Sequence, residues 1–130
     1  MSTDITILHN PRCSTSRAAL QAVEESGRSF EVIPYLKEPR TDEQLRELIG
    51  ILDTDPTELV RRDATFVKLG LFDEDVTTAD QVVATLVAHP ELLQRPIVIR
   101  HDADGDRAII GRPKTAVPEF LAGTTTTEVE

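Results

Sequence analysis

The sequence predicts an α/β domain with a four-stranded mixed sheet and a helical block inserted between the two halves of that sheet. The expected elements follow the order β-α-β, helical block, β-β-α. A strand–helix–strand order makes the first two strands parallel, and a tight-turn signal makes the last two antiparallel. The 130 residues suit one domain. We expect it over residues 1–122, with the insertion at about 41–94 and a flexible tail at 123–130.

The first half of the sheet is predicted from a strand, a break, a helix and a second strand. Residues 4–9 (DITILH) alternate apolar and polar side chains before becoming continuous, which is typical of a strand. Asn10 and Pro11 end it, because proline lacks an N–H and has a fixed φ. Apolar residues then recur at helical spacing over 14–26, and residues 30–35 (FEVIPY) form the second strand.

The middle of the chain shows three helix starts. They are expected at Thr41, where Gln44 completes a capping box, at Asp55-Pro56 as N-cap and first helical position, and at Thr77 or Thr78. The helix that opens at Pro56 is expected to run through Arg61 and Arg62.

The last part of the chain predicts a hairpin and a helix. Residues 96–100 and 107–111 form the strands, Asp104-Gly105 is the turn signal, and a helix starts at Pro113 and ends at Gly123. This order of elements is a thioredoxin-like architecture. The reactive position of that architecture follows the first strand, where Cys13 stands.

Composition excludes several classes of protein. The net charge is −9, from 23 acidic and 14 basic residues, which argues against a general binder of nucleic acid or of anionic membranes. No stretch approaches the roughly 18 apolar residues of a membrane span, and the N-terminus does not resemble a secretory signal. One cysteine excludes an internal disulfide framework and suits the cytoplasm.

Cys13 lies where a thiolate would be stabilised. At the N-terminus of a helix starting near Ser14, free backbone amides and the helix dipole favour an anion, and Arg12 and Arg17 add positive charge. Hydroxyls of nearby serines could donate hydrogen bonds, and His9 could stabilise the anion when protonated. A lone cysteine is often a small buried hydrophobic residue, but this polar junction favours a reactive thiol beside a site for an oxyanion.

Three further arginines are candidates for that site. Arg61, or alternatively Arg62, lies on the expected inserted helix, Arg95 precedes Pro96 at the third strand, and Arg112 follows the fourth strand. In a thioredoxin-like fold the residue before the third strand packs beside the reactive loop, usually through a cis-proline, which places Pro96 there. The guanidinium fork suits a tetrahedral oxyanion.

Other cysteine motifs do not fit. A tyrosine-phosphatase loop requires Arg where Ala19 stands, and a dithiol redox site requires Cys where Ser16 stands. The three histidines have no spacing with Cys13 that indicates a metal site, so no metal and no bound cofactor is expected.

The segment HNPRCSTSR, residues 9–17, resembles the signature of the glutathione/glutaredoxin-coupled arsenate reductase family. ELVRRD, KLGL, HPELLQRPIVI and GRP resemble the later motifs of that family, in the same order. The resemblance implies a thioredoxin-like fold with a helical insertion and a Cys13 nucleophile that forms a thiol–arsenate adduct. It also implies oxyanion binding by Arg61, Arg95 and Arg112. Support for the thiolate and the anion loop is expected from His9, Asn10, Ser14, Thr15, Ser16 and Arg17.

The partners that this reading requires are external thiols. Reduction of As(V) to As(III) takes two electrons, and the chain has a single thiol. The resemblance names a small thiol such as glutathione as co-substrate and a glutaredoxin-type protein as the partner that resolves the product. Two alternatives remain open: a glutathione-dependent thiol reductase, given Cys13-x-x-Ser16, and an Spx-type adaptor that binds RNA polymerase.

Overall fold

The chain folds into two compact units. The computed structural model describes residues 3–112 and 115–129, with residues 123–129 described by their backbone alone. The sheet unit comprises Met1–Pro34 and Arg95–Glu130, and the helical unit comprises Tyr35–Gln94. The helical unit is inserted between the two halves of the sheet unit, and it begins at Tyr35, before the expected boundary at about 41.

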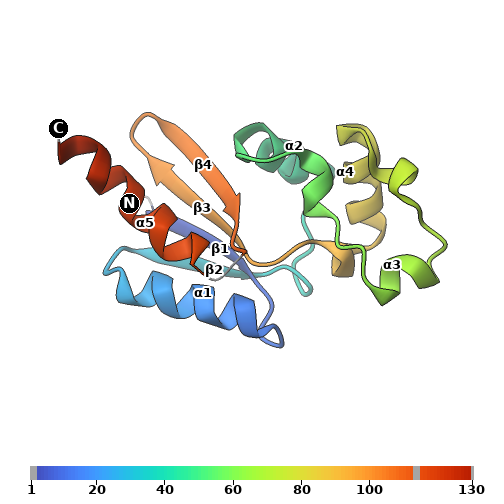
Figure 1. Cartoon of the computed structure of the whole chain (residues 1–130), viewed down its shortest axis with the longest axis horizontal. Coiled ribbons are helices and arrows are strands. Elements are labelled where there is room, and N and C mark those ends of the chain that lie inside the picture. The colour runs from blue at the N-terminus through green and yellow to red at the C-terminus, as the bar shows by residue number, and fades with distance from the viewer. Residues whose placement is uncertain (1–2, 113–114, 130) are drawn as a thin grey trace. The chain divides into compact units, whose positions relative to one another are not determined.

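The sheet has four strands in the order β2-β1-β3-β4 (Figure 1). The strands are β1 (Ile5–His9), β2 (Phe30–Pro34), β3 (Ile97–Asp102) and β4 (Gly105–Ile110). β1 pairs in parallel with β2 and antiparallel with β3, and β3 and β4 form an antiparallel hairpin. The predicted α/β fold with a mixed four-stranded sheet is confirmed.

Two helices cover one face of this sheet. α1 (Ser14–Glu25) and α5 (Ala116–Val129) lie side by side against it (Figure 1). Their apolar sides meet alternate residues of the strands, and this core consists of Ile5, Ile7, Ala19, Val23, Val98, Ile109, Val117 and Leu121. Burying these side chains fixes α1, and with it the start of α1 at Cys13, against the central strand β1.

α5 differs from the prediction at its end. The expected start at Pro113 lies outside the described residues. The helix does not end at Gly123 but continues to Val129. A glycine in a helix costs about 1 kcal/mol relative to alanine, which weakens a helix without ending it. The mobility predicted for residues 123–130 stays a prediction.

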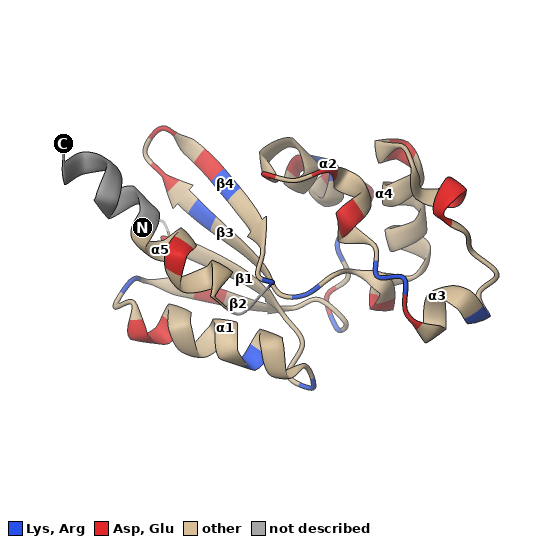
Figure 2. Cartoon of the chain, in the orientation of Figure 1, with Lys and Arg blue, Asp and Glu red and all other residues tan. Residues whose placement is uncertain are grey.

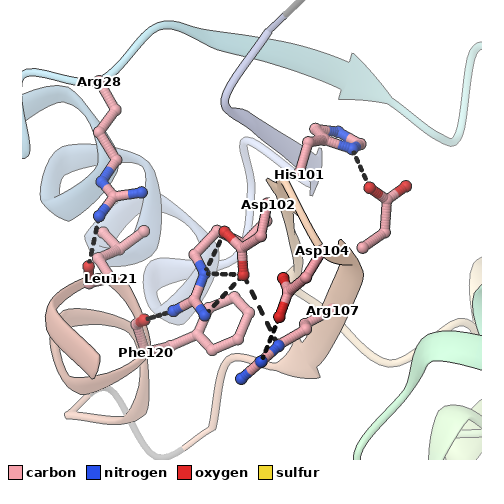
Figure 3. A network of polar contacts seen from close by, with 9 residues as sticks. Arg28, His101, Asp102, Asp104, Arg107, Phe120 and Leu121 are labelled. Atoms are coloured by element: carbon pink, nitrogen blue, oxygen red, sulfur yellow. Dashed lines mark hydrogen bonds and ion pairs between the residues drawn. The ribbon is translucent and has the colours of Figure 1, made fainter. Parts of the chain in front are cut away.

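Partly buried polar contacts hold α5 against β3 and against the segment before β2 (Figure 3). Arg100, only 3% exposed, binds the Asp102 carboxylate through Nε and Nη2, and its guanidinium lies 4.8 Å from the centre of the Phe120 ring. Its Nη1 donates to the carbonyl of Phe120, and Nη2 of Arg28 donates to the carbonyl of Leu121 at 3.1 Å. The hydrogen bonds from Arg100 lower the pKa of Asp102. The carboxylate therefore stays charged beside its partner.

The helical unit confirms all three predicted starts, although the start at Asp55-Pro56 opens a 3-10 turn. Its elements are α2 (Asp42–Ile51), η1 (Pro56–Leu59), α3 (Ala64–Lys68), η2 (Asp73–Val76), α4 (Ala79–Ala88) and η3 (Pro90–Leu92). Thr41 and Gln44 form the predicted capping box of α2. Thr78, rather than Thr77, caps α4 in a second box with Gln81.

The prediction that Arg61 and Arg62 lie on a helix is wrong. Asp55 and Pro56 open only the 3-10 turn η1. Val60 is extended and pairs with Leu93, and the backbone N–H of Arg61 donates to the carbonyl of Leu92 at 2.8 Å. Both arginines thus lie on an extended segment that ends at Asp63, the N-cap of α3. Pairing with a distant segment replaces the helical bonds that local sequence favours.

Among the residues that the structure describes, no helix is long and apolar enough to cross a membrane.

Candidate active site

Cys13 occupies the N-cap position of α1. Its backbone is extended, with φ −99° and ψ 122°, and its carbonyl accepts the N–H of Arg17 at 2.9 Å as the first bond of the helix. Its own N–H donates to the carbonyl of Asn10 at 3.0 Å, which closes the turn around Pro11. The half-buried sulfur therefore faces the free amides of the first helical turn, where a negative charge is stabilised.

The surroundings of Cys13 favour its thiolate. Burial alone would raise the pKa of the thiol, but a hydrogen bond from the Ser16 backbone and one from the Arg95 side chain lower it. The Thr15 backbone and the charge of Arg112 lower it further. The pKa of Cys13 consequently lies below its usual value. A thiolate is the nucleophilic form, so the sulfur is suited to attack.

Arg112 and Arg95 meet at this sulfur. Nη2 of Arg112 donates to Sγ of Cys13 at 3.3 Å, and Nε of Arg112 donates to the backbone carbonyl of Arg95 at 2.7 Å. The peptide bond between Arg95 and Pro96 is cis, the conformation expected from the thioredoxin-like architecture. Two guanidinium groups beside one thiolate form a site with a high local density of donors for an oxyanion.

The charged residues of the sheet unit differ between its two ends (Figure 2). Arg12 lies in the loop that leads from β1 into α1, and Arg17 follows in α1, whereas acidic residues gather at the tip of the β3–β4 hairpin beside Arg100 and Arg107. In a chain of net charge −9, this difference leaves the Cys13 end favourable for an anion.

A buried polar cluster stabilises the loop between β1 and α1 that carries Cys13. Ser16 is fully buried, and its Oγ lies 2.7 Å from Nδ1 of His9 and accepts the N–H of Asn10 at 3.0 Å. Oδ1 of Asn10 in turn accepts the N–H of Arg12 at 2.9 Å. These bonds connect the end of β1 to the first turn of α1, so His9, Asn10 and Ser16 hold the backbone on both sides of Cys13.

His9 supports the site differently from the prediction. Burial, aided by the charge of Arg17, lowers the pKa of His9. A protonated His9 that stabilises the anion is therefore disfavoured at neutral pH. A neutral imidazole can accept the Ser16 hydroxyl hydrogen through Nδ1. Its contribution is to orient Ser16.

The remaining predicted loop residues lie in the same segment. Nη1 of Arg17 donates to the carbonyl of Pro11 at 2.9 Å, so its guanidinium holds the loop rather than the sulfur. Thr15 contributes its backbone to the thiolate, and Ser14 is the first residue of α1. Arg12 is exposed beside Cys13.

Arg61 and Arg62 have different surroundings within the helical unit. Nη1 of Arg62 donates to the carbonyls of Thr57 at 2.6 Å and Val60 at 2.7 Å, and its Nε pairs with Asp73 at 3.1 Å. Arg61 makes one ion pair, from Nε to Asp63 at 3.3 Å. Arg62 is therefore occupied by its own segment, which favours Arg61 as the arginine available to a ligand. Its part in the site stays a prediction.

One residue without a predicted role packs against the site. Gly111 is buried after the end of β4, and its N–H donates to the carbonyl of Pro96 at 2.8 Å. A glycine next to a strand can signal close approach of another backbone segment, and that signal stands in the GRP motif. Across residues 3–112 and 115–129, no group of three or more His, Cys, Asp or Glu side chains could hold a metal ion.

Known proteins share both the sequence and the fold. The ArsC family profile matches residues 8–120. An arsenate reductase of Neisseria meningitidis is 38% identical over 120 residues, covering 91% of this chain and 98% of the relative. The uncharacterized protein YfgD of Escherichia coli is 37% identical over 123 residues, covering 93% and 99%.

The solved structure of an arsenate reductase from Vibrio cholerae superposes with a TM-score of 0.77 at 31% identity, covering 92% of this chain and 98% of that one. The family profile spans the cysteine loop, the helical unit and both arginines that meet at Cys13. On this agreement of sequence, fold and site, the chain belongs to the ArsC family.

Proposed function

We propose that this protein reduces arsenate to arsenite through a covalent intermediate on Cys13. The observation that carries the proposal is the contact of 3.3 Å between Nη2 of Arg112 and a thiol whose pKa is lowered by its surroundings. A thiolate next to a guanidinium is suited to attack a bound oxyanion, since the same cation attracts the anion and stabilises the nucleophile. The arsenate reductases among its relatives support arsenate as the substrate.

The first step makes a sulfur–arsenic bond without changing the oxidation state. The Cys13 thiolate attacks arsenic, and one arsenate oxygen leaves as water after taking up protons. The side chains of Arg95 and Arg112 hold the remaining oxygens and the charge of the adduct. Arg61 is the third oxyanion ligand in this proposal.

The second step is the reduction. A thiolate from a small external thiol attacks Sγ of Cys13, a disulfide forms, and the electron pair of the broken sulfur–arsenic bond stays on arsenic. Arsenic thereby changes from As(V) to As(III) and leaves as arsenite. Two thiols have supplied the two electrons, one from Cys13 and one from the small thiol.

The third step restores the enzyme. Cys13 is left in a mixed disulfide, and the chain has no second cysteine to break it. A glutaredoxin-type protein attacks the sulfur of the small thiol and releases the Cys13 thiolate. Glutathione is the small thiol that we propose, and no bound cofactor takes part in this scheme.

The test is a coupled assay with purified protein, arsenate, glutathione, glutaredoxin and an NADPH-dependent disulfide reductase. We expect arsenate-dependent NADPH oxidation that is lost in Cys13→Ser. Arg95→Ala should lower kcat/KM for arsenate while leaving the free energy of unfolding nearly unchanged. Retained turnover in Cys13→Ser would refute the covalent mechanism.

The same thiolate would also serve a glutathione-dependent thiol reductase. The lowered pKa of Cys13 favours attack on a disulfide as much as attack on arsenic. The two functions separate when the assay is repeated with a glutathionylated peptide in place of arsenate. Turnover of the peptide without turnover of arsenate would replace the main proposal with this one.

A further inference from the structure

Gly111 lies in a position that has no room for a side chain. A Cβ added there would lie 2.8 Å from Cγ of Pro96 and 2.8 Å from Cγ2 of Val117. Its φ is not in the left-handed region, so the requirement for glycine is one of space. The residue is thus held between the proline ring on one side and α5 on the other.

This close contact joins the two segments that carry the arginines of the site. Arg95 immediately precedes Pro96, and Arg112 immediately follows Gly111. The segments are connected at 2.8 Å from the N–H of Gly111 to the carbonyl of Pro96, and at 2.7 Å from Nε of Arg112 to the carbonyl of Arg95. Their separation therefore sets where both guanidinium groups lie relative to Cys13.

We propose that Gly111 is a positioning residue, whose missing side chain allows Arg95 and Arg112 to reach the same sulfur. The hydrogen bond of 3.3 Å from Nη2 of Arg112 to Sγ of Cys13 weakens as the donor moves away from the sulfur. A methyl group at residue 111 would lie too close to both the Pro96 ring and Val117, so residue 111 and the ring must move apart. That movement separates the two backbone segments and takes guanidinium charge away from the thiolate.

Of the two expected effects of this change, only the effect on arsenate turnover rests on the proposed function. In Gly111→Ala we expect the pKa of the Cys13 thiol to rise, because cations that favour the thiolate have moved. We also expect kcat/KM for arsenate to fall by about 10- to 100-fold, the order of loss that a small misplacement of catalytic groups produces.

The primary experiment measures the rate of Cys13 alkylation by iodoacetamide as a function of pH. Because the chain has a single cysteine, the rate reports one thiol. Gly50→Ala is the matched control, since it makes the same change in α2, where nothing lies within 4 Å of the added Cβ. We expect the alkylation profile of Gly111→Ala to shift to higher pH and that of Gly50→Ala to match the wild type.

A second variant tests whether crowding is the cause. Val117→Ala removes one of the two side chains that an added Cβ would meet. The double variant Gly111→Ala/Val117→Ala should therefore have a profile between those of Gly111→Ala and the wild type. If the single variant does not fold, the double variant is compared with Val117→Ala alone, and a shift to higher pH is expected.

Three results would overturn the proposal: a wild-type profile in Gly111→Ala, identical profiles in the single and double variants, or, in the fallback comparison, identical profiles with and without the added methyl. Alkylation requires no arsenate. Absence of arsenate turnover in the wild type would contradict the proposed function and leave this test intact.

Discussion

Removing the guanidinium of Arg112 should reduce the reactivity of Cys13 by about tenfold. The contact between Nη2 and Sγ is 3.3 Å. In a medium with the dielectric constant of water, two unit charges at this separation attract each other by about 1.3 kcal/mol, which is a lower bound on their interaction energy in the protein. That free energy corresponds to about a tenfold smaller fraction of thiolate at a pH below the pKa of the thiol. Arg112→Ala should therefore raise the pKa of Cys13.

The assay is iodoacetamide alkylation at low ionic strength, with Arg107→Ala as control. Arg107 lies on β4, the strand that Arg112 follows, but it pairs across the hairpin with Arg100 and therefore lies at the end of the sheet remote from the cysteine loop. The Arg107 side chain is 59% exposed and lies 3.5 Å or more from its carboxylate partners, so its loss should cost at most about 1 kcal/mol of stability. The alkylation rate of Arg112→Lys should lie between the rates of Arg112→Ala and Arg107→Ala, since lysine keeps the charge without the fork of donors.

Equal alkylation rates for Arg112→Ala and Arg107→Ala over the whole pH range would refute this reasoning. They would mean that the amides of α1 stabilise the thiolate without help from Arg112. Added salt gives a second check, because it should reduce the difference between wild type and Arg112→Ala.

Four further predictions concern the site and its support. Ser16→Ala should lower the free energy of unfolding in urea by about 1–3 kcal/mol, because His9 and the N–H of Asn10 lose a buried partner. The lowered pKa of His9 means that the unfolded chain binds its proton more readily. Stability should therefore fall as the pH drops below about 6.5, less so in His9→Gln. Arg62→Ala should cost about 1–2 kcal/mol of stability in the same urea experiment, since its hydrogen bonds to backbone carbonyls are lost. Arg61→Ala should leave stability nearly unchanged and reduce kcat/KM for arsenate by about 100-fold; the reverse pattern would exchange their roles.

The features that sequence predicts well here depend on neighbours in the chain. The capping box at Thr41 and the helix start at Thr78 depend on residues within one turn, so the pattern and the structure coincide. The parallel pair β1–β2 follows from a short crossover through α1, which has one favoured handedness. The N-cap position of Cys13 follows from the proline turn directly before it.

The features that sequence predicts poorly depend on distant contacts. Nothing local indicates that Val60 pairs with Leu93, and this pairing is what removes Arg61 and Arg62 from a helix. The sequence also does not indicate that Arg112 donates a hydrogen bond to the backbone carbonyl of Arg95, because every residue has a carbonyl. The lowered pKa of His9 needed its burial to be known.

Because the helical unit is inserted between the two halves of the sheet unit, Cys13 is synthesised well before Arg95 and Arg112. Cys13 and α1 leave the ribosome before Arg95 and Arg112, which follow only after the whole of Tyr35–Gln94 has been made. The central strand β1 likewise waits for β3 before it is paired on both sides. Domains fold as units during synthesis. A nascent chain therefore carries the thiol before the two arginines that help to lower its pKa have been made, and their part in activating the nucleophile waits for the complete fold.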